Sequence, residues 1–231
     1  MKKTRSVFIS RDLSEDSPLT SILKTAGLKV SGQSLIQFSL LAFESLPDCD
    51  WIFFYSSNGV RYFFQGLEEL QCHLPEQIQL AAMGKGTGRA LKSLGYSPDF
   101  IGDGKPDATA RFFLQAAESQ RVLFARAFNS AKSVQNLLAP YINIIDLPVY
   151  KNEIKKDLHL PEMDYVILTS SMNVDAYFQQ KTSGDNKTYI AIGKPTALRY
   201  ARWIEQEVYI PDAPSEKALA RLVLDLEKKA K

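Results

Sequence analysis

One pattern occurs twice in this chain, and it restricts the possible folds more than any other feature. The first copy begins at Asp50 and the second at Asp164. Each copy has an acidic residue, an apolar run, two serines and then a valine after two more positions, with an aromatic pair on the next turn. An apolar run that stops at Ser-Ser and continues with helical spacing predicts a buried strand, a tight turn and an N-capped helix. The chain is therefore expected to contain two such strand–turn–helix units.

Other segments repeat in the same order at a similar spacing. The matching pairs are residues 6–11 with 121–126, 35–38 with 147–150, and 80–87 with 189–196, about 110–115 residues apart. A period of this length is too long for a solenoid and indicates an internal duplication. Alternating strands and helices favour parallel, doubly wound sheets. The sequence thus predicts an α/β protein of two similar units, with residues 142–145 as a strand, 147–150 as a separate extended segment and 102–106 as a connection.

Composition and charge exclude several classes of protein. A formal net charge of +2 argues against a polybasic nucleic-acid binder, and no apolar run approaches the roughly 20 residues that span a bilayer. Cys49, Cys72, His73 and His159 have neither metal-ligand spacing nor a disulfide framework. The apolar run near the N-terminus is too short for the core of a signal peptide. We therefore expect a cytoplasmic enzyme or binding protein that takes a small molecule and uses no structural metal.

Two glycine-containing turns are candidate anion sites. Residues 84–88 read Gly-Lys-Gly-Thr-Gly, which lacks the spacing of a P-loop and the three glycines of a dinucleotide fingerprint. Its counterpart at residues 193–196 keeps the first glycine and the threonine, here Gly193 and Thr196. Backbone N–H groups and a hydroxyl at a helix start favour an anion, carboxylate as readily as phosphate. The alternative is that Thr87 and Thr196 only cap their helices.

Further candidates lie at the Ser-Ser turns and at strand ends. The turn residues, which either cap helices or donate to a polyanionic ligand, are Ser56, Ser57, Asn58, Ser170, Ser171 and Met172. No G-x-S-x-G pattern surrounds these serines, which argues against a nucleophile elbow. Arg11 and Arg126 each end a predicted strand, and arginine binds carboxylates in a bidentate manner. Tyr150 ends an extended segment, where its phenol either reaches a cleft between the units or is buried at their junction.

Taken in order, several short motifs resemble one known family. They are Ile9-Ser-Arg11, Phe54-Tyr-Ser-Ser-Asn-Gly-Val60, Met83-Gly-Lys-Gly-Thr87, Leu147-Pro-Val-Tyr150, Leu168-Thr-Ser170 and Ala191-Ile-Gly-Lys-Pro-Thr196. Each motif is weak alone, but the ordered set is specific and covers nearly the whole chain. It resembles the uroporphyrinogen-III synthase family.

The resemblance implies a domain arrangement that the repeat alone would not reveal. The repeat suggests a division near residue 116, whereas the family builds one domain from both chain ends. Residues 1–34 with 151–231 would form the first domain and residues 38–147 the second. Residues 35–37 and 148–150 would be the linkers. Both domains would be flavodoxin-like with parallel sheets, joined by a two-stranded extended linker that permits hinge motion, and the two Ser-Ser turns would face each other across a cleft.

The resemblance also implies an activity. The family member would be a cyclising hydro-lyase of tetrapyrrole (heme) biosynthesis that converts hydroxymethylbilane to uroporphyrinogen III, with loss of water, inversion of the last pyrrole ring and no cofactor. Tyr150 would donate a proton to the leaving hydroxyl. The carboxylates of the substrate would be bound by Arg11, Ser56, Ser57, Asn58, Gly84, Thr87, Arg126, Ser170, Ser171, Met172, Gly193 and Thr196. We expect a monomer that makes at most a transient contact with the preceding pathway enzyme.

Two other functions are compatible with parts of the sequence. A non-catalytic two-domain receptor that closes on a small anion would share the cleft and the hinge. A nucleotide-dependent transferase is disfavoured because the phosphate-binding fingerprints are missing.

Overall fold

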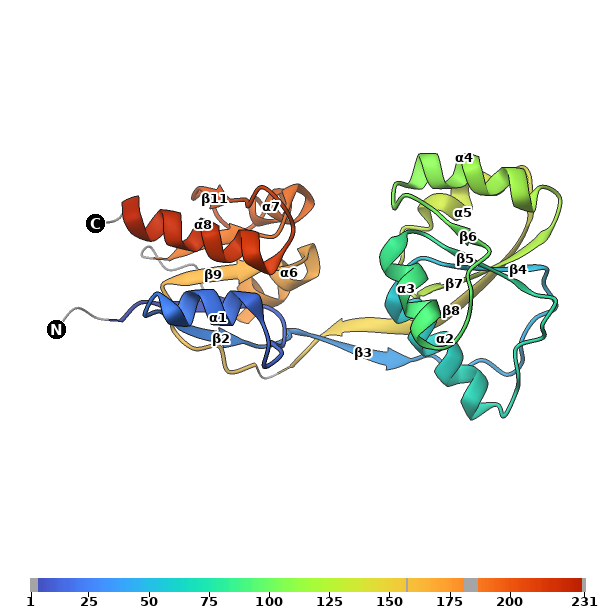
Figure 1. Ribbon diagram of the computed structural model, residues 1–231, viewed down its shortest axis with the longest axis horizontal. Helices are drawn as coiled ribbons and strands as arrows, with labels where there is room; N and C mark the ends of the chain where they lie inside the picture. The colour runs from blue at the N-terminus through green and yellow to red at the C-terminus, as the bar shows by residue number, and fades with distance from the viewer. Residues whose placement is uncertain (1–3, 157, 181–186, 230–231) are drawn as a thin grey trace. The chain divides into compact units, whose positions relative to one another are not determined.

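Parallel strand pairs predominate in the two sheets of the computed structural model, which describes residues 4–156, 158–180 and 187–229 (Figure 1). The chain divides into two units. Unit 1 comprises Met1–Gln37 and Glu153–Lys231, and unit 2 comprises Phe38–Asn152. The chain passes from one unit to the other within strand β3 (Ile36–Leu40) and again within strand β8 (Asn143–Ile154). Helices and parallel strands alternate in both units, which confirms the predicted α/β class.

The sheet of unit 1 has five strands. They are β1 (Ser6–Ile9), β2 (Lys29–Gly32), β9 (Tyr165–Leu168), β10 (Thr188–Ala191) and β11 (Val208–Tyr209), in the spatial order β2-β1-β9-β10-β11. The first strand along the chain thus lies between the second and the third, which is the flavodoxin-like order. Helices α1 (Pro18–Thr25) and α8 (Glu216–Lys229) pack together on one face of this sheet, and α6 (Ser171–Gln180) and α7 (Lys194–Tyr200) on the other (Figure 1).

Side chains of these strands divide between the two faces with the period of two that a strand imposes. Val7 and Ile9 of β1 pack in the core beneath α1 and α8, whereas Phe8 joins the core beneath α6 and α7. In β9, Tyr165 and Ile167 face the first core, and Val166 joins the second. Because helices cover both faces, these strands are apolar throughout, which is why the sequence shows unbroken apolar runs.

The sheet of unit 2 has six strands in the spatial order β3-β8-β7-β4-β5-β6. Its remaining strands are β4 (Trp51–Phe54), β5 (Gln79–Ala82), β6 (Phe100–Ile101) and β7 (Arg121–Ala127). Its helices are α2 (Ser57–Glu69), α3 (Lys85–Ser93), α4 (Pro106–Ala117) and α5 (Ser133–Leu138). Apolar residues of α2 and α3 form one core with β4, β5 and β7, and those of α4 and α5 form another on the opposite face.

Five strands of each sheet have the same arrangement with different starting points along the chain, and β3 adds a sixth strand to the second sheet. β7 takes the place of β1, β8 that of β2, and β4, β5 and β6 those of β9, β10 and β11. Three of the repeated pairs, those at β1 and β7, at β4 and β9 and at β5 and β10, are therefore strands at equivalent positions of the two sheets. The fourth pair, residues 35–38 and 147–150, falls instead in β3 and β8, which are neighbours in one sheet. The duplicated turn follows the third strand of the flavodoxin-like order in both units.

Two local expectations differ from the structure. Helix α4 was not expected after the connection at residues 102–106, yet it begins at Pro106 itself, where a fixed φ and a missing N–H suit the first helical position. Segments 142–145 and 147–150 were expected to be separate, but both belong to β8. Pro148 is tolerated in β8 because it lies opposite Arg126 at a register shift of the β7–β8 ladder.

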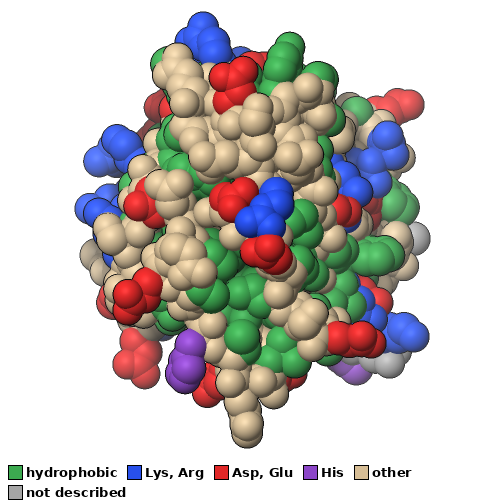
Figure 2. Space-filling model, turned by 90° about the vertical axis from the view of Figure 1, so that its right-hand side faces the viewer, with side chains coloured by type: hydrophobic (Ala, Val, Ile, Leu, Met, Phe, Trp, Pro, Cys, Tyr) green, Lys and Arg blue, Asp and Glu red, His purple; other side chains and the backbone are tan. Residues whose placement is uncertain are grey.

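Surface charge is mixed rather than dominated by one sign. On the face shown in Figure 2, basic and acidic side chains are interspersed. Within the part of the chain that the structure describes, no helix combines the length and apolar character needed to cross a membrane. The same residues contain no group of three or more His, Cys, Asp or Glu side chains placed to hold a metal ion.

The two cysteines are expected to differ in reactivity. Cys49 is buried, and burial raises the pKa of its thiol to about 11, whereas Cys72 is a partly exposed free thiol. Since the thiolate is the nucleophile, Cys72 should react with a disulfide reagent at pH 8 while Cys49 stays protected. Counting thiols before and after denaturation measures this. Rapid modification of both cysteines in the native protein would contradict it.

Candidate functional site

Four predicted site elements of unit 2 lie at or near the carboxyl edge of its sheet, where α/β proteins bind ligands. Two turns follow β4 and β5, while Arg126 and Tyr150 lie within β7 and β8 near the point where β7 ends. Ser56 joins two of them. Its Oγ accepts a hydrogen bond from the Gly59 N–H at 3.1 Å, so it caps α2 as the sequence predicted. The same Oγ lies 3.1 Å from the hydroxyl of Tyr150 in β8. The structure thus brings the Ser-Ser turn and Tyr150 together within one unit.

Tyr150 is held by aromatic rings as well as by Ser56. Its side chain is buried, and its ring stacks on that of Tyr62 with centroids 5.3 Å apart and an interplanar angle of 20°. The ring of Phe38 lies 6.1 Å away on a tilted plane. The Tyr150 carbonyl accepts a hydrogen bond from the Phe128 N–H at 2.8 Å. These contacts fix the position of the phenol, while its role as proton donor stays a prediction.

Ser57 and Ser171 make the same contact in their respective units. Ser57 Oγ donates to the carbonyl of Gly86 at 3.3 Å, and Ser171 Oγ donates to the carbonyl of Pro195 at 3.4 Å. Each carbonyl belongs to the first turn of the following helix, α3 or α7. The duplicated turn therefore connects two neighbouring helix starts at the carboxyl edge of each sheet.

The starts of α3 and α7 are built on glycine. Gly84 and Gly193 are the N-cap residues, both in extended conformation, and no side chain of the described residues makes a cap hydrogen bond there. Thr87 and Thr196 are the third helical residues and are buried. The alternative that these threonines are helix caps is therefore wrong. Uncapped N–H groups leave the start of α3 able to bind an anion, whereas Pro195 removes one donor from α7.

The second Ser-Ser turn is built like the first. Ser170 Oγ accepts from the Asn173 N–H at 3.2 Å and from Asn173 Nδ2 at 2.9 Å, so it caps α6. Met172, in the first turn of α6, and Asn58, in that of α2, are both half-buried. Arg11 follows β1 and lies 3.9 Å from Glu216 Oε1, with 38% of its side chain exposed.

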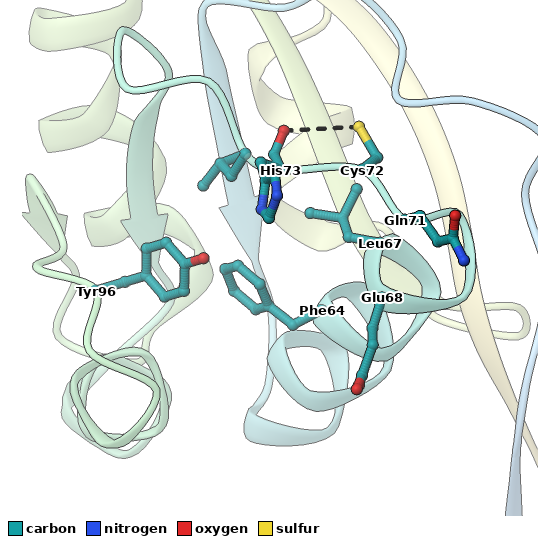
Figure 3. Close-up of a pocket in the computed structure, with 8 residues that line it drawn as sticks. Phe64, Leu67, Glu68, Gln71, Cys72, His73 and Tyr96 are labelled. Atoms are coloured by element: carbon teal, nitrogen blue, oxygen red, sulfur yellow. Dashed lines mark hydrogen bonds between the residues drawn. The ribbon is translucent and has the colours of Figure 1, made fainter.

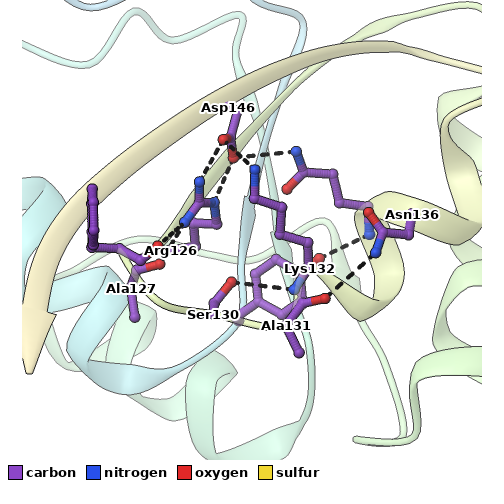
Figure 4. Close-up of polar contacts among 10 residues, drawn as sticks. Arg126, Ala127, Ser130, Ala131, Lys132, Asn136 and Asp146 are labelled. Carbon is purple, nitrogen blue, oxygen red and sulfur yellow. Dashed lines mark hydrogen bonds and ion pairs between the residues drawn. The ribbon is translucent and has the colours of Figure 1, made fainter.

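Arg126 is placed differently from the other candidates (Figure 4). Only 4% of the residue is exposed, and its Nε and Nη2 each donate to Asp146 at 2.5 Å. Its Nη1 donates to the carbonyls of Ala127 and Phe128 at 2.7 and 2.8 Å. All three nitrogens therefore contact the protein itself, and the residue holds the loop that follows β7. Substrate contact by Arg126 stays a prediction.

The carboxylate of Asp146 gathers further donors. Lys132 Nζ lies 2.9 Å away and Gln135 Nε2 3.2 Å away, both from the loop and helix that follow β7 (Figure 4). Hydrogen bonds from Arg126, reinforced by those from Lys132 and Gln135, hold the pKa of Asp146 well below its usual range. The carboxyl edge of β7 and β8 is thus an ionic cluster that is already satisfied, unlike the start of α3.

Two hollows lie next to helices of these elements. One, of about 360 Å³, is lined by residues of the last turns of α2 and the segment after it, including Phe64, Cys72 and His73, with Tyr96 opposite (Figure 3). Since α2 starts at the carboxyl edge, this hollow lies toward the amino ends of the strands. Another, of about 580 Å³, runs along α7 and β11. The hollow beside α2 lies away from the candidate chemistry, whereas the hollow along α7 reaches the start of that helix at Lys194. We favour the carboxyl edge because the polar groups converge there.

Sequence reasoning missed two neighbours of the candidate site. Tyr62, which stacks on Tyr150, reads in the sequence only as part of the apolar stripe of a helix. Asp146, which binds Arg126, shows no pattern that links it to a strand-end arginine. The contact of Arg126 with Asp146 could be predicted only once β7 and β8 are known to be adjacent. The stack of Tyr62 on Tyr150 joins a helix and a strand, and no sequence pattern indicates it.

This chain is similar to a known family and to several solved structures. The chain matches the family model described as Uroporphyrinogen-III synthase HemD over residues 18–221. A structure of uroporphyrinogen-III synthetase from Helicobacter pylori is similar with a TM-score of 0.72 at 23% identity, covering 96% of this chain and 100% of that one. A mutant uroporphyrinogen III synthase from Thermus thermophilus gives 0.63 at 17% identity, covering 97% and 100%. At 17% and 23% identity, these two solved structures show a shared fold and no more. The family model, in contrast, matches residues 18–221, which is most of the chain.

Proposed function

The chain belongs to the uroporphyrinogen-III synthase family, and we propose that its carboxyl-edge residues cyclise hydroxymethylbilane to uroporphyrinogen III with loss of water. The family's reaction is that of a lyase in tetrapyrrole biosynthesis. The observation that carries the assignment is the family match over residues 18–221. The contact of Tyr150 with the capped start of α2 supports the more detailed assignment to a cyclising hydro-lyase.

The chemistry of the substrate fits the polar groups at these edges. Hydroxymethylbilane carries eight carboxylates, which require N–H and O–H donors rather than an apolar pocket. The start of α3 offers backbone N–H groups without a competing side-chain cap. We assign carboxylate binding to these groups and to the other predicted residues of the Ser-Ser turns, of the helix starts and of β1, namely Arg11, Ser56, Ser57, Asn58, Gly84, Thr87, Ser170, Ser171, Met172, Gly193 and Thr196. Arg126 holds the loop after β7, and its contact with a substrate carboxylate stays a prediction.

The proposed reaction begins with loss of the terminal hydroxyl. A proton from the phenol of Tyr150 lets this hydroxyl leave as water, which gives a protonated azafulvene cation and a phenolate that the proton later lost from carbon neutralises. The substituted carbon of the last pyrrole attacks the cation to form a spiro intermediate. That intermediate reopens, and the ring closes again in the inverted orientation with loss of a proton from carbon. Ser56 orients the phenol, because its Oγ is itself fixed by the Gly59 N–H.

The main contribution of the protein is to select one conformer of the substrate. Closure without inversion gives the type I isomer spontaneously, so the enzyme must favour a bent chain in which the substituted carbon reaches the azafulvene. Because the free substrate closes without help, we further propose a transient contact with the enzyme that supplies it. We expect a monomer that works in the cytoplasm, with the two units as its domains.

The proposed activity is tested by incubating the purified protein with freshly prepared hydroxymethylbilane and resolving isomers I and III of the oxidised product. We expect isomer III to dominate and to increase with protein concentration. Formation of isomer I alone, at the rate of the spontaneous reaction, would overturn the assignment and favour a binding protein.

Alanine variants of Ser57 and Thr196 are expected to raise the KM for hydroxymethylbilane. Loss of one hydroxyl donor to a carboxylate should raise KM by about fivefold at little cost in kcat. Ser93→Ala is the matched control for Ser57→Ala, because Ser93 Oγ also donates to a helix carbonyl, that of Ala90, at the far end of α3. An unchanged KM in both variants would reduce these residues to a structural role.

A further inference from the structure

Arg61 occupies an unusual position on α2, one turn beyond Ser56. Its guanidinium carbon lies 4.5 Å from the centroid of the Tyr62 ring, and its Nη2 donates to the Tyr62 hydroxyl at 2.7 Å. The residue itself is exposed, whereas Tyr62 is buried. A cation over an aromatic face with an added hydrogen bond restricts a side chain that normally has many rotamers. The guanidinium is therefore held in place at the surface of unit 2.

This guanidinium has donors to spare. Arginine carries five N–H donors, and the contact with the Tyr62 hydroxyl uses one of them. Several other arginines of the described chain are paired with carboxylates, among them Arg121 with Asp50, Arg126 with Asp146 and Arg199 with Asp175. No carboxylate of the described residues forms an ion pair with Arg61. Since the residue is ordered by an uncharged group, its charge remains available to a ligand.

The position of Arg61 connects it to the candidate site. Tyr62, on which the guanidinium lies, stacks face to face with Tyr150, and the Tyr150 hydroxyl lies 3.1 Å from Ser56 Oγ. Arg61, Tyr62, Tyr150 and Ser56 thus form one continuous series of contacts within unit 2. We propose that Arg61 binds a carboxylate of the substrate beside Tyr150. This inference rests on the proposed function, because it takes the substrate to be a polycarboxylate.

Such a contact would help to position the reacting end of the substrate. A bidentate bond from a planar guanidinium restricts both the distance and the orientation of the carboxylate. A side chain that is ordered before binding loses little entropy when the ligand arrives. Arg61 is therefore a substrate-binding residue that adds affinity and orientation next to the proton donor, with no role in proton transfer itself.

Arg61→Ala and Arg61→Lys test the proposal, with Arg111→Ala as the matched control. Arg111 is also exposed, and its guanidinium lies 4.8 Å from the centroid of the neighbouring Phe112, but on α4, which packs on the opposite face of the sheet. We expect Arg61→Ala to raise the KM for hydroxymethylbilane about tenfold, with kcat within about twofold of wild type. Arg61→Lys should recover part of the lost affinity, because lysine keeps the positive charge but lacks the planar guanidinium that binds a carboxylate through two N–H groups. Arg111→Ala should leave KM unchanged.

Binding without turnover separates this inference from the activity. Uroporphyrin III, the stable oxidised form of the product, carries eight carboxylates, and its binding can be followed by quenching of protein fluorescence. Arg61→Ala should weaken this binding about tenfold and make it less sensitive to salt, since one ion pair is lost. A loss no larger than that of Arg111→Ala, or a fall in kcat at constant KM, would overturn the proposal. Type I product alone from wild type would overturn the proposed function, while the uroporphyrin measurement would still decide on Arg61.

Discussion

Asp146→Asn is expected to lower the free energy of unfolding by about 2 kcal/mol, since it leaves the charge of the buried Arg126 without its carboxylate partner, whose own side chain is 31% exposed. Its partner Arg126 is only 4% exposed and donates hydrogen bonds from two nitrogens to the Asp146 carboxylate. An asparagine keeps the shape and one acceptor oxygen but not the charge. Urea denaturation followed by circular dichroism measures the change.

Two comparisons make this result specific to the buried pair. Asp50→Asn changes the same residue type at a pair with Arg121 whose side chains are 39% and 41% exposed, and should cost no more than about 1 kcal/mol. Adding Arg126→Met to Asp146→Asn removes the unpaired charge and should restore part of the stability. Equal losses for Asp146→Asn and Asp50→Asn would show that Arg126 is not electrostatically buried.

The same pair predicts how stability depends on pH. Arg126 depresses the pKa of Asp146 in the folded protein, so the stabilisation is present above the pKa of the unfolded chain, about 4, and is lost as the pH falls below it. Asp146→Asn should therefore give a flatter stability curve than wild type on the acid side. A residual slope is expected from Asp50, whose pKa hydrogen bonds from Arg121 hold at about 2.

Tyr150→Phe is expected to lower kcat for isomer III about 100-fold, the lower range for loss of a general acid, with little change in KM. The substitution removes the hydroxyl that lies 3.1 Å from Ser56 Oγ but keeps the ring that stacks on Tyr62. The fold should therefore be retained, as a near-native melting temperature would verify. Initial rates over a range of hydroxymethylbilane concentrations separate kcat from KM.

The control for this variant is another buried tyrosine with a bonded hydroxyl. Tyr200 donates to the carbonyl of Ile190 at 3.2 Å in unit 1 and is fully buried. Tyr200→Phe should cost some stability but leave turnover near wild type. If Tyr150→Phe also turns over near the wild-type rate, Tyr150 is not the proton donor, and the leaving hydroxyl departs without a side-chain acid.

Local features of the fold could be predicted from the sequence because they depend on neighbours along the chain. Ser56 and Ser170 cap their helices as the Ser-Ser turns indicated, since an N-cap contacts a backbone N–H three residues away. The alternative that Thr87 and Thr196 cap their helices is wrong, because the N-cap is a glycine in extended conformation three positions before each threonine. Helix boundaries of this kind depend on backbone geometry that composition alone does not specify.

Long-range features could not be predicted in the same way. A repeat shows that two segments share a structure, but not which strands pair, and β1 pairs with β9 rather than with its counterpart β7. Arg126 illustrates the consequence. A strand-end arginine suggested a ligand site, and no sequence pattern indicated that Asp146 of the adjacent strand binds its guanidinium. The stack of Tyr62 on Tyr150 likewise joins a helix and a strand far apart in sequence.

The different starting points of the two sheets determine the order in which the units can form during synthesis. Unit 2 is one continuous stretch, so its sheet can close as soon as residue 152 has left the ribosome. In unit 1, β1 cannot pair with β9 until β9 has been synthesised. The hydrogen bond of Ser6 to Asp164, for example, joins residues that are 158 positions apart. The N-cap residue of α1 gains its long-range contact later still, because Ser17 donates to Glu216, which lies 199 residues further along the chain. Nascent chains therefore carry a finished unit 2 beside an open unit 1, whose exposed strand edges are the part most in need of chaperone protection.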